Sequence, residues 1–177
     1  MSIKSKIRTV PNYPLEGIMF RDISTLLADS EGLQELAGKL FEELKGLENE
    51  IDYIIGIESR GFTIGSILAY VLKKGFVMIR KPGKLPVKTI RIEYELEYGS
   101  DALEIAFDAF PPKSKILLVD DLLATGGTAI AAINLIEKIE GVILGTAFIV
   151  NLPDLGGSNK IKNLGYSVIS LAEFEGD

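Results

Sequence analysis

Two adjacent carboxylates, Asp120 and Asp121, stand at the end of an apolar run and are followed by a turn of small residues. The run 116–119 lacks the alternation of a half-exposed strand, so it predicts a strand covered on both faces, as in a parallel sheet flanked by helices. In open sheets of this kind, ligands bind beyond the carboxyl ends of the strands. The pattern therefore predicts that the strand stops at the two acids and that both acids face a ligand.

The turn that follows, at residues 124–128, has the sequence Ala-Thr-Gly-Gly-Thr, which suits an anion. Glycine permits positive φ and leaves space for successive N–H groups to converge, and both threonine hydroxyls can donate as well. The apolar spacing over 129–139 predicts a helix whose positive dipole end faces the same anion. The chain has neither the P-loop pattern nor G-x-G-x-x-G. An acid pair or a Gly-Gly turn alone is usually structural, but together they predict a phosphate-binding turn.

A second strand–turn–helix unit is predicted at residues 53–71. A short apolar strand is followed by Glu58, Ser59 and Arg60 and then by an apolar helix. The turn brings a carboxylate, a hydroxyl and a guanidinium to another strand end, and arginine can contact phosphate oxygens through two parallel hydrogen bonds. The alternative is that Glu58 and Arg60 only form a surface ion pair.

A basic stretch, residues 81–88, follows the next predicted strand. Its prolines and glycine exclude a helix, and its lysines would usually only solvate a loop, which is our expectation for Lys81 and Lys88. Beyond it, the alternation of apolar and charged residues over 90–98 predicts a strand. Residues 103–107 are its expected hairpin partner, across a turn at 99–102.

The remaining segments complete an alternating pattern. Proline and glycine favour an irregular segment over the core at residues 11–27, in which an apolar and charged Met-Phe-Arg-Asp run either packs or contacts a ligand. Asp29 or Ser30 can cap the helix that follows. The last third places strands at 142–151 and 166–171 around helical stretches. This alternation predicts an α/β fold with a central, mostly parallel sheet.

The composition bounds the class of protein. A chain of 177 residues with 47% hydrophobic and 25% charged residues fits one globular domain over 1–177. It has no Cys and no His, so any acid–base group must be a carboxylate, Tyr or Lys. The net charge of −6 disfavours nonspecific nucleic-acid binding, although 80–91 is locally basic. No stretch approaches the length of a membrane span, so we expect a cytoplasmic enzyme with no membrane or nucleic-acid partner.

Residues 116–128 resemble the phosphoribosyl-pyrophosphate motif of the type I phosphoribosyltransferases, in which a hydrophobic strand, two acids and a T-G-G-T turn bind the ribose hydroxyls and 5′-phosphate. The Leu-Leu-Ala variant within it is similar to the adenine phosphoribosyltransferases, and the resemblance extends from the N-terminal segment to Leu155. It implies one α/β domain with helices flanking a central, mostly parallel sheet. It also implies a small N-terminal hood at about 11–27 and a flexible β-hairpin flap, the catalytic loop, at about 81–103.

The resemblance implies roles on the phosphoribosyl pyrophosphate (PRPP) side. Asp120 and Asp121 would orient the ribose hydroxyls, and Arg60 would be catalytic by neutralising the leaving pyrophosphate. Mg²⁺ would be held mainly by substrate oxygens and water, without a dedicated protein site. The residues implied for the 5′-phosphate are Ala124, Thr125, Gly126, Gly127 and Thr128. Those implied for the pyrophosphate are Glu58, Ser59, Arg60, Arg80 and Lys84.

On the base side, the resemblance implies that Phe20 stacks on the purine and that backbone groups near Arg21 recognise the base edge. Leu155 matches the position that packs on the opposite purine face. Glu97 matches the residue that accepts the proton from the purine, and Tyr98 follows it in the flexible loop. Composition alone leaves Leu155 equally interpretable as a residue that anchors its turn.

The implied reaction joins N9 of adenine to C1′ of PRPP and releases pyrophosphate and AMP, a step of purine salvage, in an expected homodimer. A base with an exocyclic oxygen is an alternative substrate, because relatives that use guanine or hypoxanthine share the phosphate turn. A noncatalytic regulator that senses PRPP while binding RNA or a protein is a rival from another class. An unrelated phosphate-binding α/β protein is a second rival, which would leave the hood and the basic flap unexplained.

Overall fold

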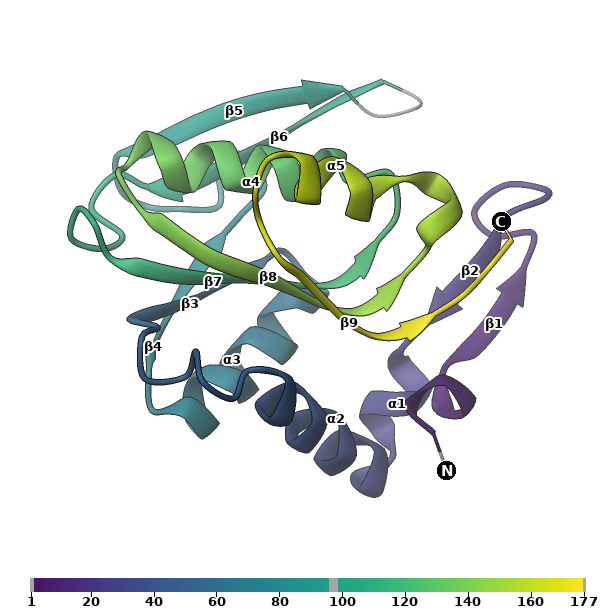
Figure 1. Cartoon of the computed structure of the whole chain (residues 1–177). Helices are drawn as coiled ribbons and strands as arrows, with labels where there is room; N and C mark the ends of the chain where they lie inside the picture. Colours follow the sequence, from purple (N-terminus) through teal and green to yellow (C-terminus); the bar gives the residue numbers. More distant parts are fainter. Residues whose placement is uncertain (1, 96–98, 177) are drawn as a thin grey trace.

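The computed structural model describes residues 2–95 and 99–176, and it places a central sheet between two layers of helices (Figure 1). The elements in chain order are η1 (Ile3–Lys6), β1 (Arg8–Pro11), β2 (Met19–Asp22), α1 (Ser24–Ala28), α2 (Ser30–Glu43), β3 (Tyr53–Ile57), α3 (Arg60–Leu72), β4 (Gly75–Ile79), β5 (Thr89–Glu95), β6 (Ser100–Ala106), β7 (Lys115–Leu123), α4 (Gly127–Lys138), β8 (Val142–Asn151), η2 (Pro153–Leu155), α5 (Gly157–Asn163) and β9 (Val168–Glu173).

The central sheet has the strand order β4-β3-β7-β8-β9, and every neighbouring pair in it is parallel. Along β7, Leu117 and Val119 enter the core beneath α2 and α3, whereas Ile116 and Leu118 enter the core beneath α4. Side chains on both faces are therefore buried, as the unbroken apolar run predicts. The predicted α/β fold with a parallel sheet is confirmed.

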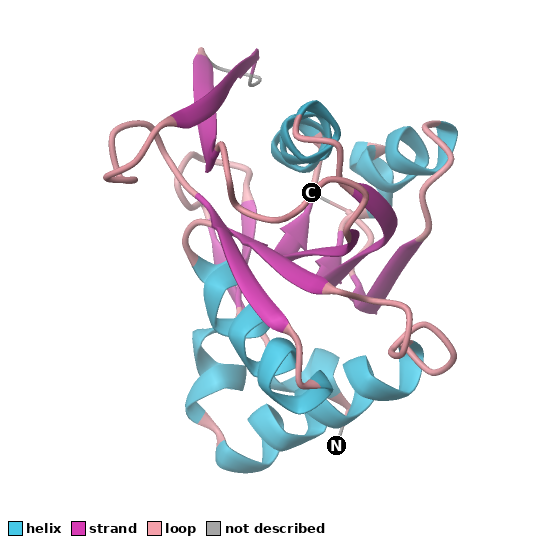
Figure 2. Cartoon of the chain, turned by 90° about the vertical axis from the view of Figure 1, so that its left-hand side faces the viewer, coloured by secondary structure: helices cyan, strands magenta, loops and turns pink. Residues whose placement is uncertain are grey.

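The helices cover both faces of this sheet. In Figure 1, α1, α2 and α3 lie below it, and α4 and α5 lie above it. Figure 2 shows the same layers from the side, with the strands running between the two groups of helices. Asp29 caps α2 by accepting a hydrogen bond from the N–H of Glu31, as the sequence predicts.

Two antiparallel hairpins stand outside the sheet. The β1–β2 hairpin lies beside the end of β9 and the C-terminus, and the β5–β6 hairpin lies over α4 (Figure 1). The β5–β6 pair is held to the body by the backbone of Arg80, which exchanges two hydrogen bonds with Glu104. These hairpins correspond to the predicted hood and flap.

Three local predictions were wrong. The strand does not stop at the two acids, because β8 pairs with β7 as far as Leu123. The segment 11–27 is not irregular throughout, since it contributes to the β1–β2 hairpin and most of α1. The turn does not occupy 99–102, because residues from Ser100 onward already pair with β5. In each case a tertiary partner extends the regular structure beyond the local sequence signal.

No helix within the described residues is both long enough and apolar enough to cross a membrane.

Candidate active site

The candidate site lies where the sheet changes direction of winding. The chain passes from β3 outward to β4 in one direction, and then enters β7 on the other side of β3. Loops that leave β3 and β7 therefore diverge, and such a switch point is the usual ligand site of an open α/β sheet. A cavity of about 430 Å³ opens there. Its lining residues are Glu58, Ser59, Arg60, Lys81, Tyr94, Asp101 and the whole run from Asp120 to Ala129.

The predicted phosphate-binding turn, residues 124–128, lines this cavity and is called the phosphate turn below. Gly126 has a φ of 86°, which non-glycine residues rarely adopt, and it precedes the first residue of α4. The turn thus delivers N–H groups and the positive end of a 12-residue helix to one place. Lys160 of α5 donates to the carbonyl oxygen of Thr125 at 2.9 Å, which fixes the turn from outside.

A glycine from outside the motif makes this turn possible. The N–H of Gly157 donates to the carbonyl oxygen of Ala124 at 3.0 Å. A Cβ at Gly157 would lie 2.2 Å from that oxygen and 2.8 Å from the nitrogen of Gly126, so no other residue fits without moving the backbone. The sequence reasoning missed Gly157, and its only signal was a Gly-Gly pair after a proline turn.

The two carboxylates project from β7 into the same cavity. Asp121 is 5% exposed, and its N–H donates to Oδ1 of Asp120 at 2.9 Å. Burial raises the pKa of Asp120, and the neighbouring charge of Asp121 raises it further. Burial also raises the pKa of Asp121, against the opposing effect of Arg60. Among the described residues, the buried Oδ2 of Asp121 receives no hydrogen bond, and a hydroxyl group of a ligand could donate one.

Arg60 joins the two loops of the switch point. Its Nε lies 2.8 Å from Oδ2 of Asp121, but the N–H is not aligned for a hydrogen bond. Among the described residues, this buried oxygen therefore has no hydrogen-bond donor. The sequence alternative of a Glu58–Arg60 surface pair is not what the structure shows, because Arg60 pairs with Asp121 and Glu58 pairs with Arg80.

Glu58 lies on the side of the cavity for which the sequence predicts pyrophosphate contacts. Its peptide bond to Ser59 is cis. Its Oε2 accepts from Nε of Arg80 at 3.2 Å and from the N–H of Lys81 at 2.9 Å. Burial opposes ionisation of this carboxyl, but the two hydrogen bonds and the positive charges of Arg80 and Lys84 together outweigh it and lower the pKa of Glu58. Lys84 is exposed, and only its carbonyl contacts the group, by accepting from Arg80 at 3.2 Å.

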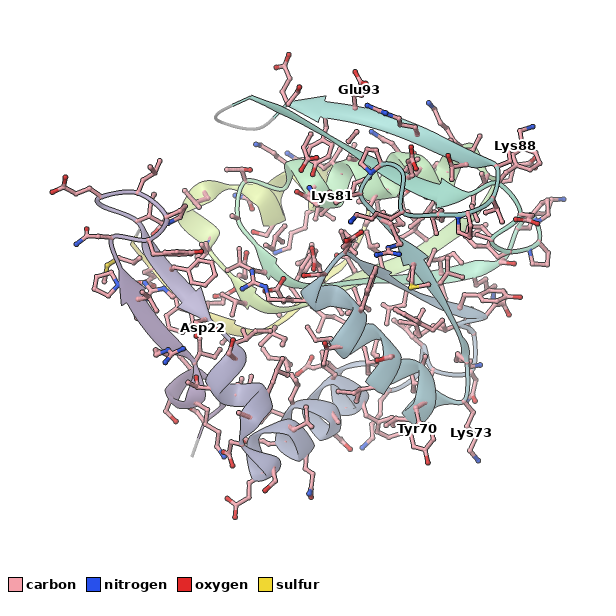
Figure 3. The ribbon with its side chains drawn as sticks, turned by 180° about the vertical axis from the view of Figure 1, so that it is seen from behind. Asp22, Tyr70, Lys73, Lys81, Lys88 and Glu93 are labelled. Carbon is pink, nitrogen blue, oxygen red and sulfur yellow. The ribbon has the colours of Figure 1, made fainter. Side chains whose placement is uncertain are left out.

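The β5–β6 hairpin contributes two side chains, and the loop before it a third, that the sequence did not predict to be in the site. The hydroxyl of Tyr94 lies 3.3 Å from Oγ1 of Thr128 and donates to Asp101 at 3.4 Å. Lys81 forms an ion pair with the same aspartate. Figure 3 shows Lys81 between the hairpin and the sheet, away from Lys88. The sequence predicts Tyr94 only as an apolar position of an alternating strand, and it predicts Lys81 as a solvated loop lysine.

The hood reaches the site through Phe20. The guanidinium carbon of Arg60 lies 5.2 Å from the centre of the Phe20 ring, and Tyr13 meets that ring edge-on at 5.1 Å. The side chain of Arg21 leaves the opposite face of the strand and is buried. Leu155 is half-buried in η2, two residues before the Gly157 contact with the phosphate turn. The structure thus gathers the Phe20 ring and the PRPP-side residues, except the side chain of Lys84.

Glu97 and Tyr98, for which the sequence predicts catalytic and loop roles, lie outside the described residues. Their predicted roles stay predictions.

Comparisons with known proteins agree with this geometry. Residues 22–161 match the model of the phosphoribosyl transferase domain family. The adenine phosphoribosyltransferase of Chlorobium limicola is 57% identical over the full length of both chains. A crystal structure of the adenine phosphoribosyltransferase from Thermoanaerobacter pseudethanolicus is similar with a TM-score of 0.92 and 44% identity, covering 97% of this chain and 98% of that one. The Saccharomyces cerevisiae enzyme, solved with an imino-altritol bisphosphate and adenine, has a TM-score of 0.90 and 40% identity, with 96% of each chain covered.

Proposed function

This chain belongs to the adenine phosphoribosyltransferase family, and from that premise we propose how its own residues bind and activate the two substrates. The activity is that of a pentosyltransferase of purine salvage, which joins adenine to the phosphoribosyl group and gives AMP. The observation that carries the proposal is the Arg60–Asp121 contact at 2.8 Å. It brings the loop after β3 and the phosphate turn after β7 to one cavity large enough for a phosphorylated sugar.

On the sugar side, the 5′-phosphate would bind the N–H groups and hydroxyls of Thr125 to Thr128 at the start of α4. The ribose hydroxyls would donate to Asp120 and Asp121. Oδ2 of Asp121 supports this assignment, because it lies beside Arg60 but receives no hydrogen bond among the described residues, and a ligand hydroxyl would donate one. The same negative charges would stabilise the oxocarbenium-like ribose that develops as pyrophosphate leaves.

On the leaving-group side, Arg60, Arg80 and Lys84 would neutralise the pyrophosphate, with Glu58 holding Arg80 in place. Lys84 is exposed. For this role, either its loop moves toward the cavity or its side chain reaches the active site of a neighbouring subunit. Mg²⁺ fits the donor set, because the cavity offers carboxylate oxygens and no sulfur or imidazole. It would be held chiefly by PRPP and water beside Asp120 and Asp121, and its charge would lower the cost of pyrophosphate departure.

On the base side, adenine would stack on Phe20, with Leu155 on its other face and backbone groups near Arg21 at its edge. The 5.2 Å contact between the Phe20 ring and Arg60 supports the placement, since it puts the ring beside the pyrophosphate loop. Glu97 would accept the N9 proton directly or through a water. The displacement at C1′ needs no covalent enzyme intermediate, so catalysis rests on alignment and charge stabilisation.

The experiment that tests this assignment measures pyrophosphate release from PRPP, adenine and Mg²⁺ by the wild-type protein and by Arg60→Gln. We expect the variant to lose about 10²–10³-fold in kcat while keeping its melting temperature within a few degrees. Lys45→Gln, which removes an exposed cation paired with Glu42 just beyond α2, is the control and should keep full activity. Equal kcat values for Arg60→Gln and wild type would remove Arg60 from the mechanism.

A homodimer is the second part of the proposal. Tyr70 is 86% exposed on α3, and Met78 is 42% exposed on β4, which is an edge strand of the sheet. Figure 3 shows Tyr70 pointing away from the body of the protein. If this surface is the interface, Tyr70→Glu should shift the sedimenting species from dimer to monomer, and Leu164→Glu on the far helical layer should not. A monomeric wild type, or a dimeric Tyr70→Glu, would contradict this assignment.

We also propose that residues 1–177 form one domain, with the hood at about 11–27 and the catalytic loop at about 81–103 as its appendages. The packing of Ile3, Ile23 and Phe174 into the same buried cluster as Leu117 supports a common core. A cytoplasmic location and the lack of a nucleic-acid partner stay predictions from the sequence. A single cooperative unfolding transition by two probes would support the one-domain proposal, and separate transitions would contradict it.

A further inference from the structure

The β2 strand of the hood presents different side chains to its two faces. Successive residues of a strand point to opposite sides, so Phe20 faces Arg60 in the active site and Arg21 faces away from it. Arg21 is nevertheless only 8% exposed. Burying a guanidinium costs free energy unless protein groups replace the water around it. The groups around Arg21 therefore stabilise its buried position and the strand that carries it.

Those surroundings contain no carboxylate partner among the residues that the structure describes. Nη1 of Arg21 donates to Oγ1 of Thr9 at 2.6 Å. Its buried Nε has no acceptor among the described residues. Its main neighbour is Phe174, whose ring centre lies 4.4 Å from the guanidinium carbon. Nζ of Lys4 lies 4.8 Å from the same ring. The ring of Phe174 therefore forms cation–π contacts with both Arg21 and Lys4.

The C-terminal segment that carries Phe174 is itself tied to the other side of the base subsite. The N–H of Phe174 donates to the carbonyl oxygen of Asn151 at 3.1 Å, and Nδ2 of Asn151 donates to Glu173 at 3.0 Å. Two residues later, the N–H of Gly176 donates to Oδ2 of Asp154 at 2.8 Å. Asp154 immediately precedes Leu155, so this segment spans from the hood to the turn that carries Leu155.

We propose that Phe174 is a positioning residue for the adenine subsite, which it sets by fixing the hood through Arg21 while its neighbours fix the Leu155 turn. This inference rests on the proposed function, because it assumes that Phe20 and Leu155 bind the base. Phe174 touches no substrate in this account. It sets the separation and orientation of the two surfaces between which adenine stacks, and it leaves the PRPP side untouched.

The test compares Phe174→Leu with Phe174→Tyr. Leucine keeps an apolar side chain but lacks a π face, whereas tyrosine keeps the ring. We expect Phe174→Leu to raise KM for adenine about 3- to 10-fold with little change in KM for PRPP, and Phe174→Tyr to stay within about twofold of wild type. Phe107→Leu is the control, because Phe107 is a 53% exposed phenylalanine beneath another lysine, Lys88, outside the site.

A second pair of variants keeps the test decisive if Phe174→Leu does not fold. Asp154 is exposed, so Asp154→Ala should fold while releasing Gly176, and Asp154→Asn keeps an acceptor for that N–H. We expect Asp154→Ala to raise KM for adenine selectively and Asp154→Asn to restore it. Unchanged adenine KM in both Phe174→Leu and Asp154→Ala, or an equal rise in both substrates' KM, would overturn the inference. Lack of AMP formation by the wild type would instead overturn the proposed function.

Discussion

The two halves of the site are built in different ways. The sugar-phosphate half comes from one short stretch, in which β7, two acids, the phosphate turn and α4 follow each other directly. The base half is assembled from three distant segments: the β1–β2 hairpin, the η2 turn and the C-terminal tail. Figure 1 shows these three meeting at one end of the molecule, beside the last strand of the sheet.

Because the two halves are built differently, substitutions in them should have different effects. The sugar-phosphate half stands on a sheet buried on both faces and on helix α4, so its geometry is fixed by the core. The base half is joined to the edge of the same core through Ile23 and Phe174, but its segments are held to one another by a few hydrogen bonds and aromatic contacts, such as the Arg21–Phe174 contact. We therefore expect substitutions in the first half to affect turnover or PRPP binding, and substitutions in the second to affect the choice and affinity of the base.

The largest effect is expected from Asp121→Asn, which removes a charge from the sugar-phosphate half while keeping its shape. Loss of a preorganised charge beside the reacting carbon should lower kcat by about 10²–10³-fold, with KM for adenine nearly unchanged. Steady-state kinetics with both substrates would measure it. Asp108→Asn, an exposed aspartate far from the phosphate turn, is the control. A kcat within about twofold of wild type would show that Asp121 has no part in the chemistry.

Gly157→Ala changes the point where the two halves of the proposed site touch. Its Cβ would lie 2.2 Å from the carbonyl oxygen of Ala124, so the phosphate turn and the Leu155 turn must separate. A displacement of this kind should raise KM for both PRPP and adenine, by about 10- to 100-fold. Gly38→Ala has open space around its Cβ in α2 and should instead stabilise the protein by about 0.5–1 kcal/mol. Normal PRPP affinity in Gly157→Ala would mean that the turns move independently.

Tyr94→Phe tests a smaller contribution to the sugar-phosphate half. Loss of the hydroxyl removes its contacts with Thr128 and Asp101. A neutral hydrogen bond contributes about 1 kcal/mol, so KM for PRPP should rise about fivefold while kcat changes little. Tyr166→Phe, which loses a hydroxyl bonded to Glu137 on α4, is the matched control. Equal PRPP affinity in the two variants would show that the hairpin does not act on the phosphate turn.

The smallest effect concerns the stability of the hood. Hydrogen bonds from Ser24, and then from Arg8, lower the pKa of Asp22 from 3.8 to about 2. Because the folded-state pKa is depressed, the ionised carboxylate stabilises the protein above the unfolded pKa, and this contribution is lost as the pH falls toward about 2. Asp22→Asn should therefore cost about 1 kcal/mol at pH 7 and almost nothing near pH 2. Urea unfolding of both proteins across this range checks it, and a pH-independent difference would rule it out.

The same contrast explains what the sequence could predict. The phosphate turn, the carboxylate pair and the β3–Arg60 turn are contiguous, so local patterns and a family resemblance were enough to locate them. Gly157, Tyr94 and Lys81 join the site only through tertiary contacts, and apart from the Gly-Gly pair at 156–157 nothing near them in the chain marks that role. The extension of β7 past Asp121 is likewise a tertiary effect, because pairing with β8 determines where β7 ends.

We infer that the sugar-phosphate half carries out transfer and the base half selects adenine. The most direct test incubates the purified protein with Mg²⁺ and PRPP and offers adenine, hypoxanthine and guanine in turn, following the mononucleotide formed. We predict that AMP forms from adenine and that either oxopurine gives negligible product. Turnover of an oxopurine at a comparable rate would contradict the assignment of the base half, and PRPP binding without turnover of any base would contradict the enzymatic account itself.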